Sequence, residues 1–361
     1  MTIAFRAMQW NREKIVYDAI LFVGVILYVA IFMTAGRWWL SPAGDMATWE
    51  DLRIRASGTC AFLMLTIVLS IGPLTRLSRR FLPLLYNRRH FGVLTFFVAL
   101  AHGWFNINWY LSRGEWADFV STVTTLPNYA SISHFPYETL GIIGLFVLFV
   151  MAATSHDFWL KSFTPSVWKS LHMAVYAAYI ILTMHVALGV MQSEHSTFIP
   201  ILLGTAAAMV SSLHLIAGWR ERAIDRGAAT NSDGWIVVGP LQSIPDRAAR
   251  IVTARGGERI AVVRNGEQFG ALTNLCAHQN GPLGEGRIID DCVTCPWHGF
   301  QYRLEDGCAP PPFMDKVAAY RVRIKAGMVE VDPAPLSPGT RVGLARVSQA
   351  NTMQNLTTCR G

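Results

Sequence analysis

The sequence predicts a membrane all-α six-helix bundle followed by a small all-β domain. Two observations lead to this fold class. Only 15% of the 361 residues are charged, against roughly 25% in an average soluble protein. Six uncharged, apolar stretches of at least 18 residues precede position 220, whereas residues 234–332 have the charge density of a soluble domain. The expected parts are a cytoplasmic N-terminus (1–18), the six-span domain (19–219), a linker (220–233), the β domain (234–332) and a disordered tail (333–361).

The six uncharged stretches are long enough to cross a membrane, since the hydrocarbon core of a bilayer needs roughly 20 helical residues. They cover residues 19–36, 56–75, 90–112, 139–156, 170–193 and 195–219. A seventh uncharged stretch, residues 119–137, is rich in Ser and Thr and contains two prolines, so we expect an external loop there. A cleaved signal peptide is the alternative for the first stretch. Its length, and the lack of a small-x-small site close behind it, argue against cleavage.

The distribution of Lys and Arg predicts that both ends of the chain are cytoplasmic. Basic residues favour the inner side of a membrane, and with the N-terminus inside the inner segments hold thirteen of them against four outside. The inner ones are Arg6, Arg12, Lys14, Arg76, Arg79, Arg80, Arg88, Arg89, Lys161, Lys169, Arg220, Arg222 and Arg226. We therefore expect a multi-pass protein of a bacterial-type inner membrane. The net charge of +7 comes largely from such flanks, so no nucleic-acid partner is expected.

Histidines occur in pairs on the third and fifth predicted spans. His90 and His102 are 12 residues apart, and His172 and His185 are 13 residues apart, which correspond to axial rises of roughly 18 and 20 Å. The two spans run in the same direction, so His90 comes level with His172 near the cytoplasm. His102 comes level with His185 farther out, and each level could hold one haem iron between two imidazoles. The two histidines of one span point in directions that differ by about 120–140° around an ideal helix, so the spacing is compatible with either one haem or two. His214 has no partner at its level.

Residues 88–102 and 171–185 resemble the ferric-reductase-like transmembrane domain, and the resemblance extends over roughly residues 55–220. It implies b-type haems, each held by two histidines. His102, His172 and His185 stand on the most widely used positions, whereas single-haem members can lack a ligand at the position of His90. Oxidase and reductase members append a flavin- and nicotinamide-binding module. No G-x-G-x-x-G follows a predicted strand here, so we expect an electron-transfer component that depends on a separate donor.

Two Cys-His motifs predict a metal centre in the β domain. Cys276 and His278 form a C-x-H motif, and Cys295 and His298 form a C-x2-H motif 16 residues later. In a [2Fe–2S] cluster of the Rieske type, two thiolates bind one iron and two imidazoles bind the other. Structural zinc is the alternative, but zinc fingers usually pair Cys with Cys and His with His. The pattern resembles the Rieske iron–sulfur domain, which implies a small antiparallel β fold around runs at 235–238, 260–264, 269–272, 300–304 and 317–324.

Departures within these motifs bear on the expected potential of the cluster. Respiratory Rieske proteins carry a disulfide across the cluster, and its two positions hold Gly281 and Trp297 here. High-potential members place a hydroxyl that bonds a cluster sulfur where Phe300 stands. Fewer hydrogen bonds to the sulfurs lower the potential, so the resemblance implies a low-potential ferredoxin-type cluster near roughly −150 mV.

These features together predict a transmembrane electron conduit. A cytoplasmic flavoprotein reductase or ferredoxin would reduce the cluster, and the electrons would pass through stacked b haems to an external acceptor. A Rieske oxygenase also needs a mononuclear iron with two His and a carboxylate, but no His follows His298. A membrane-anchored redox sensor and a quinone-linked electron carrier are the alternatives that stay open.

Overall fold

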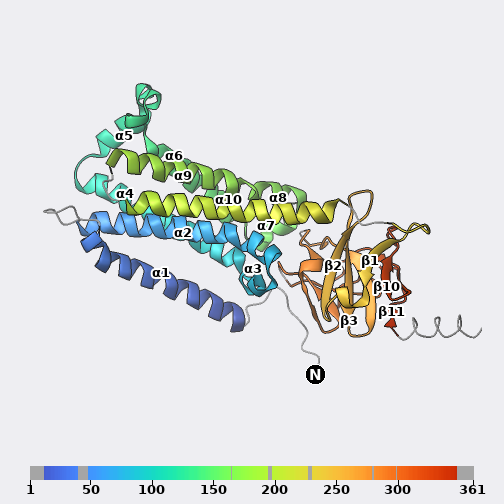
Figure 1. Ribbon diagram of the computed structural model, residues 1–361. Helices are drawn as coiled ribbons and strands as arrows, with labels where there is room; N and C mark the ends of the chain where they lie inside the picture. The colour runs from blue at the N-terminus through green and yellow to red at the C-terminus, as the bar shows by residue number, and fades with distance from the viewer. Residues whose placement is uncertain are drawn as a thin grey trace, which may run out of the picture. The chain divides into compact units, whose positions relative to one another are not determined.

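The computed structural model describes residues 12–39, 48–163, 165–193, 197–226, 230–278, 280–297 and 299–347. The chain divides into two compact units (Figure 1). We call residues 10–74 and 87–214 the helical unit, and residues 75–86 and 215–361 the β unit. The two units are treated separately below.

The helices begin and end close to the uncharged stretches of the sequence. They are α1 Arg12–Trp39, α2 Trp49–Leu77, α3 Leu82–Tyr86, α4 Arg88–Ser112, α5 Trp116–Thr124, α6 Tyr137–Ala153, α7 Asp157–Ser162, α8 Pro165–His172, α9 Ala174–Ser193 and α10 Phe198–Asp225. Short 3-10 turns cover η1 Arg79–Phe81, η2 Leu126–Ala130 and η3 Ile132–His134. The predicted external loop at 119–137 therefore contains most of α5 and both later turns.

Five of these segments are long and apolar enough to span a membrane, among the residues that the structure describes. They are Lys14–Arg37, Trp49–Leu77, Arg88–Ser112, Val167–Val190 and Ile199–Asp225. The predicted fourth span corresponds to α6, which is apolar but only 17 residues long. The predicted fifth span is divided into α8 and α9 at Met173, because Tyr176 N donates to Met173 O with the tighter spacing of a 3-10 turn.

Aromatic and small residues fill the core of the helical unit. Phe62 of α2 stacks on Tyr179 of α9 with ring centroids 5.5 Å apart, and the Tyr179 hydroxyl lies 3.2 Å from Thr66 Oγ1. α6 and α9 pack closely because Gly144 has no side chain, and a Cβ there would lie 2.5 Å from Leu182 Cδ2. α1 lies at the edge of the unit beside α2 (Figure 1).

The β unit contains eleven described strands in three antiparallel sheets. They are β1 Ile236–Pro240, β2 Ala248–Thr253, β3 Arg259–Asn265, β4 Gln268–Thr273, β5 Arg287–Ile289, β6 Cys292–Thr294, β7 Gln301–Arg303, β8 Ala319–Tyr320, β9 Val322–Lys325, β10 Met328–Val331 and β11 Ala345–Arg346. The orders are β1-β10-β9, β11-β4-β3-β2 with β8 also on β4, and β5-β6-β7. Short 3-10 turns lie at η4 Leu241–Ser243 and η5 Leu283–Glu285.

Two buried clusters form the core of this unit. One is formed by residues of the β1-β10-β9 sheet and of the five-stranded sheet and includes Phe269 and Tyr320, both fully buried. The other contains Cys276, Cys295 and Tyr302 and is associated with the β5-β6-β7 sheet. The two predicted cysteine ligands therefore lie in a core of their own, beside the larger β structure that supports it.

The expectation that residues 333–361 are disordered is wrong for their first part. β11 pairs with β4, with Ala345 opposite Phe269. Leu344 packs against the core around Tyr302, and Val342 N donates to Glu305 O at 2.7 Å. Leu344 and β11 thus cover an edge of β4 that would otherwise be open. Residues 348–361 lie outside the described residues.

The predicted linker at 220–233 is also helical where it begins. α10 continues to Asp225, and Arg259 of β3 forms ion pairs with both Glu221 and Asp225 of that helix. These ion pairs stabilise the last turns of α10 within the β unit. The helix therefore continues beyond its apolar residues.

Candidate metal centres

His102 of α4 and His185 of α9 lie next to one another in the helical unit. Their ring centroids are 6.3 Å apart and the ring planes are inclined by 73°. The Nδ1 atom of His102 lies 2.9 Å from the carbonyl oxygen of Ile54, and that of His185 lies 2.7 Å from the carbonyl oxygen of Tyr137. An imidazole that donates from Nδ1 to a carbonyl presents Nε2 as the atom that can bind a metal.

A glycine lies against each of these rings, four residues after the carbonyl partner. A Cβ at Gly58 would lie 2.9 Å from the His102 ring, and a Cβ at Gly141 would lie 2.9 Å from the His185 ring. α2 therefore supports His102 in the same way as α6 supports His185. Metal–nitrogen bonds of about 2 Å each would account for about 4 Å of the separation, and the two half-rings account for the rest. The pair thus fits an iron held between two imidazoles.

His90, near the start of α4, has a different kind of partner. Its Nδ1 atom lies 2.7 Å from Oδ2 of Asp18 on α1. The second oxygen of Asp18 accepts a hydrogen bond of 2.7 Å from Asn87 Nδ2. A carboxylate therefore orients His90, whereas backbone carbonyls orient His102 and His185.

His172 is the last residue of α8. His172 Nδ1 lies 3.0 Å from the carbonyl oxygen of Trp168, and the two rings stack with centroids 3.8 Å apart. Its Nε2 atom has a longer contact of 3.4 Å with Ser155 Oγ. The structure therefore brings His102 and His185 together and gives His90 and His172 separate hydrogen-bond partners.

His214 of α10 makes contacts typical of a packing residue. Its Nδ1 atom lies 2.9 Å from Val210 O, one turn earlier in the same helix. Its Nε2 atom lies 3.0 Å from the hydroxyl of Tyr176 on α9. These hydrogen bonds engage both ring nitrogens and link α9 to α10.

The first Cys-His loop of the β unit is closed by two backbone hydrogen bonds. Cys276 N donates to Gly281 O at 2.9 Å, and Asn280 N donates to Cys276 O at 2.8 Å. Asn280 has φ 57°, in the left-handed region that Asn tolerates better than most residues. The result is a tight loop with the Cys276 side chain buried at its base.

The second loop repeats this arrangement. Cys295 N donates to Phe300 O at 2.7 Å, and Gly299 N donates to Cys295 O at 2.9 Å. Gly299 has φ 74° and occupies the place of Asn280 in the first loop. The local sequence therefore builds two equivalent loops, each with a buried cysteine at the same position.

Each loop also contacts the predicted ligands of the other. A Cβ at Gly281 would lie 2.6 Å from Cys295 Sγ and 3.2 Å from the Trp297 ring. Phe300 stacks on His278 with ring centroids 4.1 Å apart and planes inclined by 14°. Only glycine leaves room at position 281. The two positions that hold a disulfide in respiratory Rieske proteins are thus adjacent here but contain Gly281 and Trp297.

Tyr302 of β7 is a site residue that the sequence analysis missed. Its hydroxyl lies 3.3 Å from Cys276 Sγ, and its side chain is fully buried. Burial raises the pKa of Tyr302, and its hydroxyl is placed to donate to a cluster thiolate at Cys276. The available signal was the spacing, because Phe300 and Tyr302 are two residues apart and lie on the same face of an extended segment.

Three of the four predicted cluster ligands lie in the described part of the chain. They are Cys276, His278 and Cys295, whereas His298 lies outside the described residues. No group of three His, Cys, Asp or Glu side chains among the described residues is arranged to hold a metal. Cys292 and Cys308 form no disulfide within the described residues, and burial raises the pKa of the Cys292 thiol to about 11.

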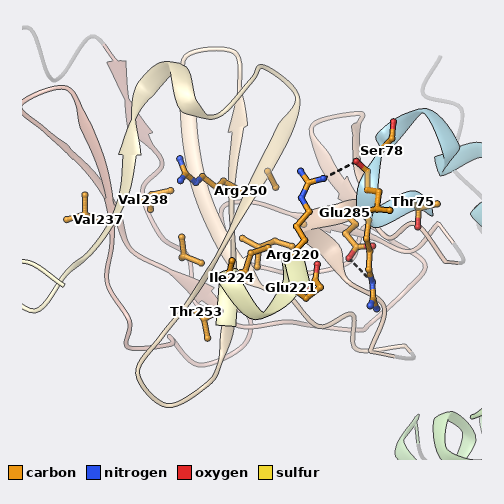
Figure 2. Close-up of a pocket in the computed structure, with 17 residues that line it drawn as sticks. Thr75, Ser78, Arg220, Glu221, Ile224, Val237, Val238, Arg250, Thr253 and Glu285 are labelled. Atoms are coloured by element: carbon orange, nitrogen blue, oxygen red, sulfur yellow. Dashed lines mark hydrogen bonds and ion pairs between the residues drawn. The ribbon is translucent and has the colours of Figure 1, made fainter. Parts of the chain in front are cut away.

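A cavity of about 840 Å³ also lies in the β unit, beside β2 and the last turns of α10 (Figure 2). Arg220 donates to Leu77 O at 3.0 Å, and Arg76 lies 3.8 Å from Glu285. Basic and acidic side chains line it together, so its charge favours no particular class of ligand.

Both parts of the chain match known families. The family model described as the ferric reductase like transmembrane component matches residues 57–183, and the one described as the Rieske [2Fe-2S] domain matches residues 234–321. The chain joins a ferric-reductase-like transmembrane domain to a Rieske [2Fe–2S] domain. Both expected resemblances are thereby confirmed.

Similar proteins match each domain almost in full. The transmembrane domain is similar to the protein-methionine-sulfoxide reductase heme-binding subunit MsrQ of Bordetella pertussis, at 28% identity over 204 residues, 56% of this chain and 92% of that protein. The Rieske domain is similar to the anthranilate 1,2-dioxygenase ferredoxin subunit of Burkholderia cepacia, at 39% identity over 88 residues, 24% of this chain and 77% of that protein. The expected cofactor classes, haem and a Rieske cluster, are confirmed at the level of the domains.

A solved structure was also matched over the Rieske domain. It is the complex of reduced oxygenase and oxidized ferredoxin in carbazole 1,9a-dioxygenase, with a TM-score of 0.27 and 28% sequence identity. The match covers 28% of this chain and 96% of that chain.

Proposed function

We propose that this chain carries electrons across a bacterial inner membrane, from a cytoplasmic donor to an external acceptor. The Rieske domain is the point of entry, and the transmembrane domain is the path across the bilayer. When bound, the cluster and the haems supply the one-electron redox chemistry. The observation that carries the proposal is the His102–His185 pair, because two imidazoles supported alike on separate helices can hold a haem inside the bundle.

The proposed topology has six spans with both termini in the cytoplasm. Five helices are long enough by themselves, and α6 is the sixth because it packs closely on α9 and supports His185. The excess of basic residues on one side favours a cytoplasmic Rieske domain. A flavoprotein reductase or ferredoxin there is the proposed donor.

The motifs suggest the ligands, and the contacts support His102 and His185 as a pair. The proposed haem ligands are His90, His102, His172 and His185. The proposed cluster ligands are Cys276, His278, Cys295 and His298. In the transmembrane domain, the Ile54 and Tyr137 carbonyls fix the orientation of the imidazoles, as hydrogen-bond partners of metal-bound histidines do. In the Rieske domain, Phe300 and Gly281 fix the two loops against each other.

A membrane-anchored redox sensor explains less of the structure. A sensor would need the Rieske domain and an anchor, but it would not need two histidines with matched glycine and carbonyl supports on α4 and α9. The conduit gives each of these features a role.

Rapid mixing tests whether the Rieske domain is the point of entry. The full-length protein is mixed without oxygen with a reduced [2Fe–2S] ferredoxin, and haem reduction is followed by absorbance. We expect reduction in the wild type and a fall to the background rate in Cys295→Ser, which lacks a cluster thiolate. The control Cys308→Ser changes a thiol that is not a proposed ligand and is expected to behave as the wild type. Equal rates for Cys295→Ser and the wild type would contradict the proposal.

A further inference from the structure

The two histidines of α4 differ in the charge of their hydrogen-bond partners. His102 Nδ1 lies against the neutral carbonyl of Ile54 at 2.9 Å. His90 Nδ1 lies 2.7 Å from a carboxylate oxygen of Asp18. Hydrogen bonds to ionised partners are stronger than those between neutral groups, so His90 has the stronger acceptor of the two.

Asp18 is itself held in place. Its side chain is 15% exposed, and its second oxygen accepts the 2.7 Å hydrogen bond from Asn87 Nδ2. Asn87 is buried and directly precedes α4. One carboxylate on α1 is thus bound at both oxygens by α4 and the residue before it, and the His90 ring has a fixed orientation. Asp18 lies outside residues 57–183, the part of the chain that matches the transmembrane family.

A carboxylate at Nδ1 changes what the other ring nitrogen can do. It withdraws the Nδ1 proton toward itself and makes Nε2 a stronger donor to a metal. A stronger donor favours the more highly charged, oxidised iron and therefore lowers the reduction potential. A neutral carbonyl at Nδ1, as for His102 and His185, has a smaller effect of the same kind.

We propose that Asp18 is a positioning residue that, through His90, holds the haem nearer the cytoplasm at a lower reduction potential than the haem at His102 and His185. This inference rests on the proposed assignment of His90 as a ligand. Electron transfer from the haem of lower potential to the haem of higher potential is favourable and runs outward. Through Asp18, α1 would thus help to set the direction of electron transfer as well as anchor the protein.

The test is a redox titration of the haem absorbance of the full-length protein, with haem per chain measured beside it. Asp18→Asn replaces the carboxylate by an amide, whose carbonyl resembles the partners of His102 and His185. We expect two haems per chain, and a rise of the lower potential alone by about 59 mV, which is a tenfold change for a one-electron couple. The control Tyr28→Phe removes another hydrogen bond of α1, that to Thr59, and is expected to shift neither potential.

Each outcome bears on one claim. Two haems with both potentials unchanged in Asp18→Asn, or a shift of the higher potential instead, would overturn the role of Asp18 and leave the proposed function intact. One haem per chain in the wild type would overturn the assignment of His90 itself. If Asp18→Asn loses a haem, the variant Asp18→Glu is measured as well. Two haems in Asp18→Glu, with the lower potential near its wild-type value, support the role of a carboxylate beside His90. Loss of a haem in both variants overturns that role.

Discussion

Single residues without a side chain determine how closely the proposed ligands are held. Gly58 and Gly141 each leave the space that one imidazole occupies, and Gly281 leaves the space beside Cys295 Sγ. The physical reason is the same at all three positions. A Cβ there would lie less than 3 Å from the side chain of a proposed ligand, and a close-packed interior cannot absorb such an overlap without moving one of the two groups.

Gly58→Ala is expected to remove the haem held by His102. The new methyl group would lie 2.9 Å from the His102 ring, so the ring must leave the position that Ile54 O fixes. Haem per chain is expected to fall by one, measured by pyridine haemochrome. Gly204→Ala on α10 is the matched control, because nothing lies within 4 Å of its Cβ position. Full haem content and an unchanged spectrum in Gly58→Ala would show that the ring does not need this space.

Tyr302→Phe is expected to lower the potential of the Rieske cluster. The hydroxyl lies 3.3 Å from Cys276 Sγ, and a hydrogen bond donated to a cluster thiolate would stabilise the reduced, more negative state. A hydrogen bond worth about 1 kcal/mol corresponds to about 40 mV for a one-electron couple. EPR-monitored titration measures the shift, and Tyr320→Phe, which removes a hydroxyl that is bonded to Glu258, is the control. An unchanged potential would mean that Tyr302 does not act on the cluster. The sequence analysis expected a low cluster potential because Phe300 has no hydroxyl. The hydroxyl of Tyr302 would make that potential higher than Phe300 alone implies.

The sequence was most informative about the helices and strands, and those that it did not predict have physical reasons. Uncharged stretches located the long helices because burial in lipid excludes charge over a whole span. The break at Met173 and helix α5 leave no comparable mark on composition. Among the described strands, β2, β5, β6, β10 and β11 were not predicted. Arg250 and the alanines mask the alternation of β2, and the two residues of β11 are too few to show a periodicity.

Leu344→Ala tests whether the segment before β11 belongs to the Rieske domain. Leu344 is partly buried against the core around Tyr302, so truncation is expected to destabilise the domain by about 1 kcal/mol. The measurement is the temperature at which the cluster absorbance is lost on heating. Met314→Ala is the control, since that side chain is 89% exposed. A melting temperature equal to that of the wild type would restore the original expectation of a disordered tail.

The whole molecule combines two domains. In both, the sequence predicted the ligands but not the residues that support them. Spacing alone selected the Cys-His motifs and the four transmembrane histidines, because ligands must recur at intervals that the chemistry fixes. Asp18, Gly58 and Tyr302 were not selected, because each acts on a residue at least 26 positions away in the sequence. Asp18 and Gly58 become visible only when the helices are placed beside one another, whereas the spacing of Tyr302 from Phe300 was a signal in the sequence.

Transfer across a bilayer is the property that unites the two domains, and trapped ferricyanide measures it. Proteoliposomes with the Rieske domain facing outward would hold ferricyanide inside and receive reduced ferredoxin outside. We expect the trapped ferricyanide to lose its colour with the wild type, and the rate to fall to that of empty vesicles with His185→Ala. Haems that become reduced while the trapped ferricyanide keeps its colour would contradict a transmembrane conduit and leave a protein that exchanges electrons on one face only.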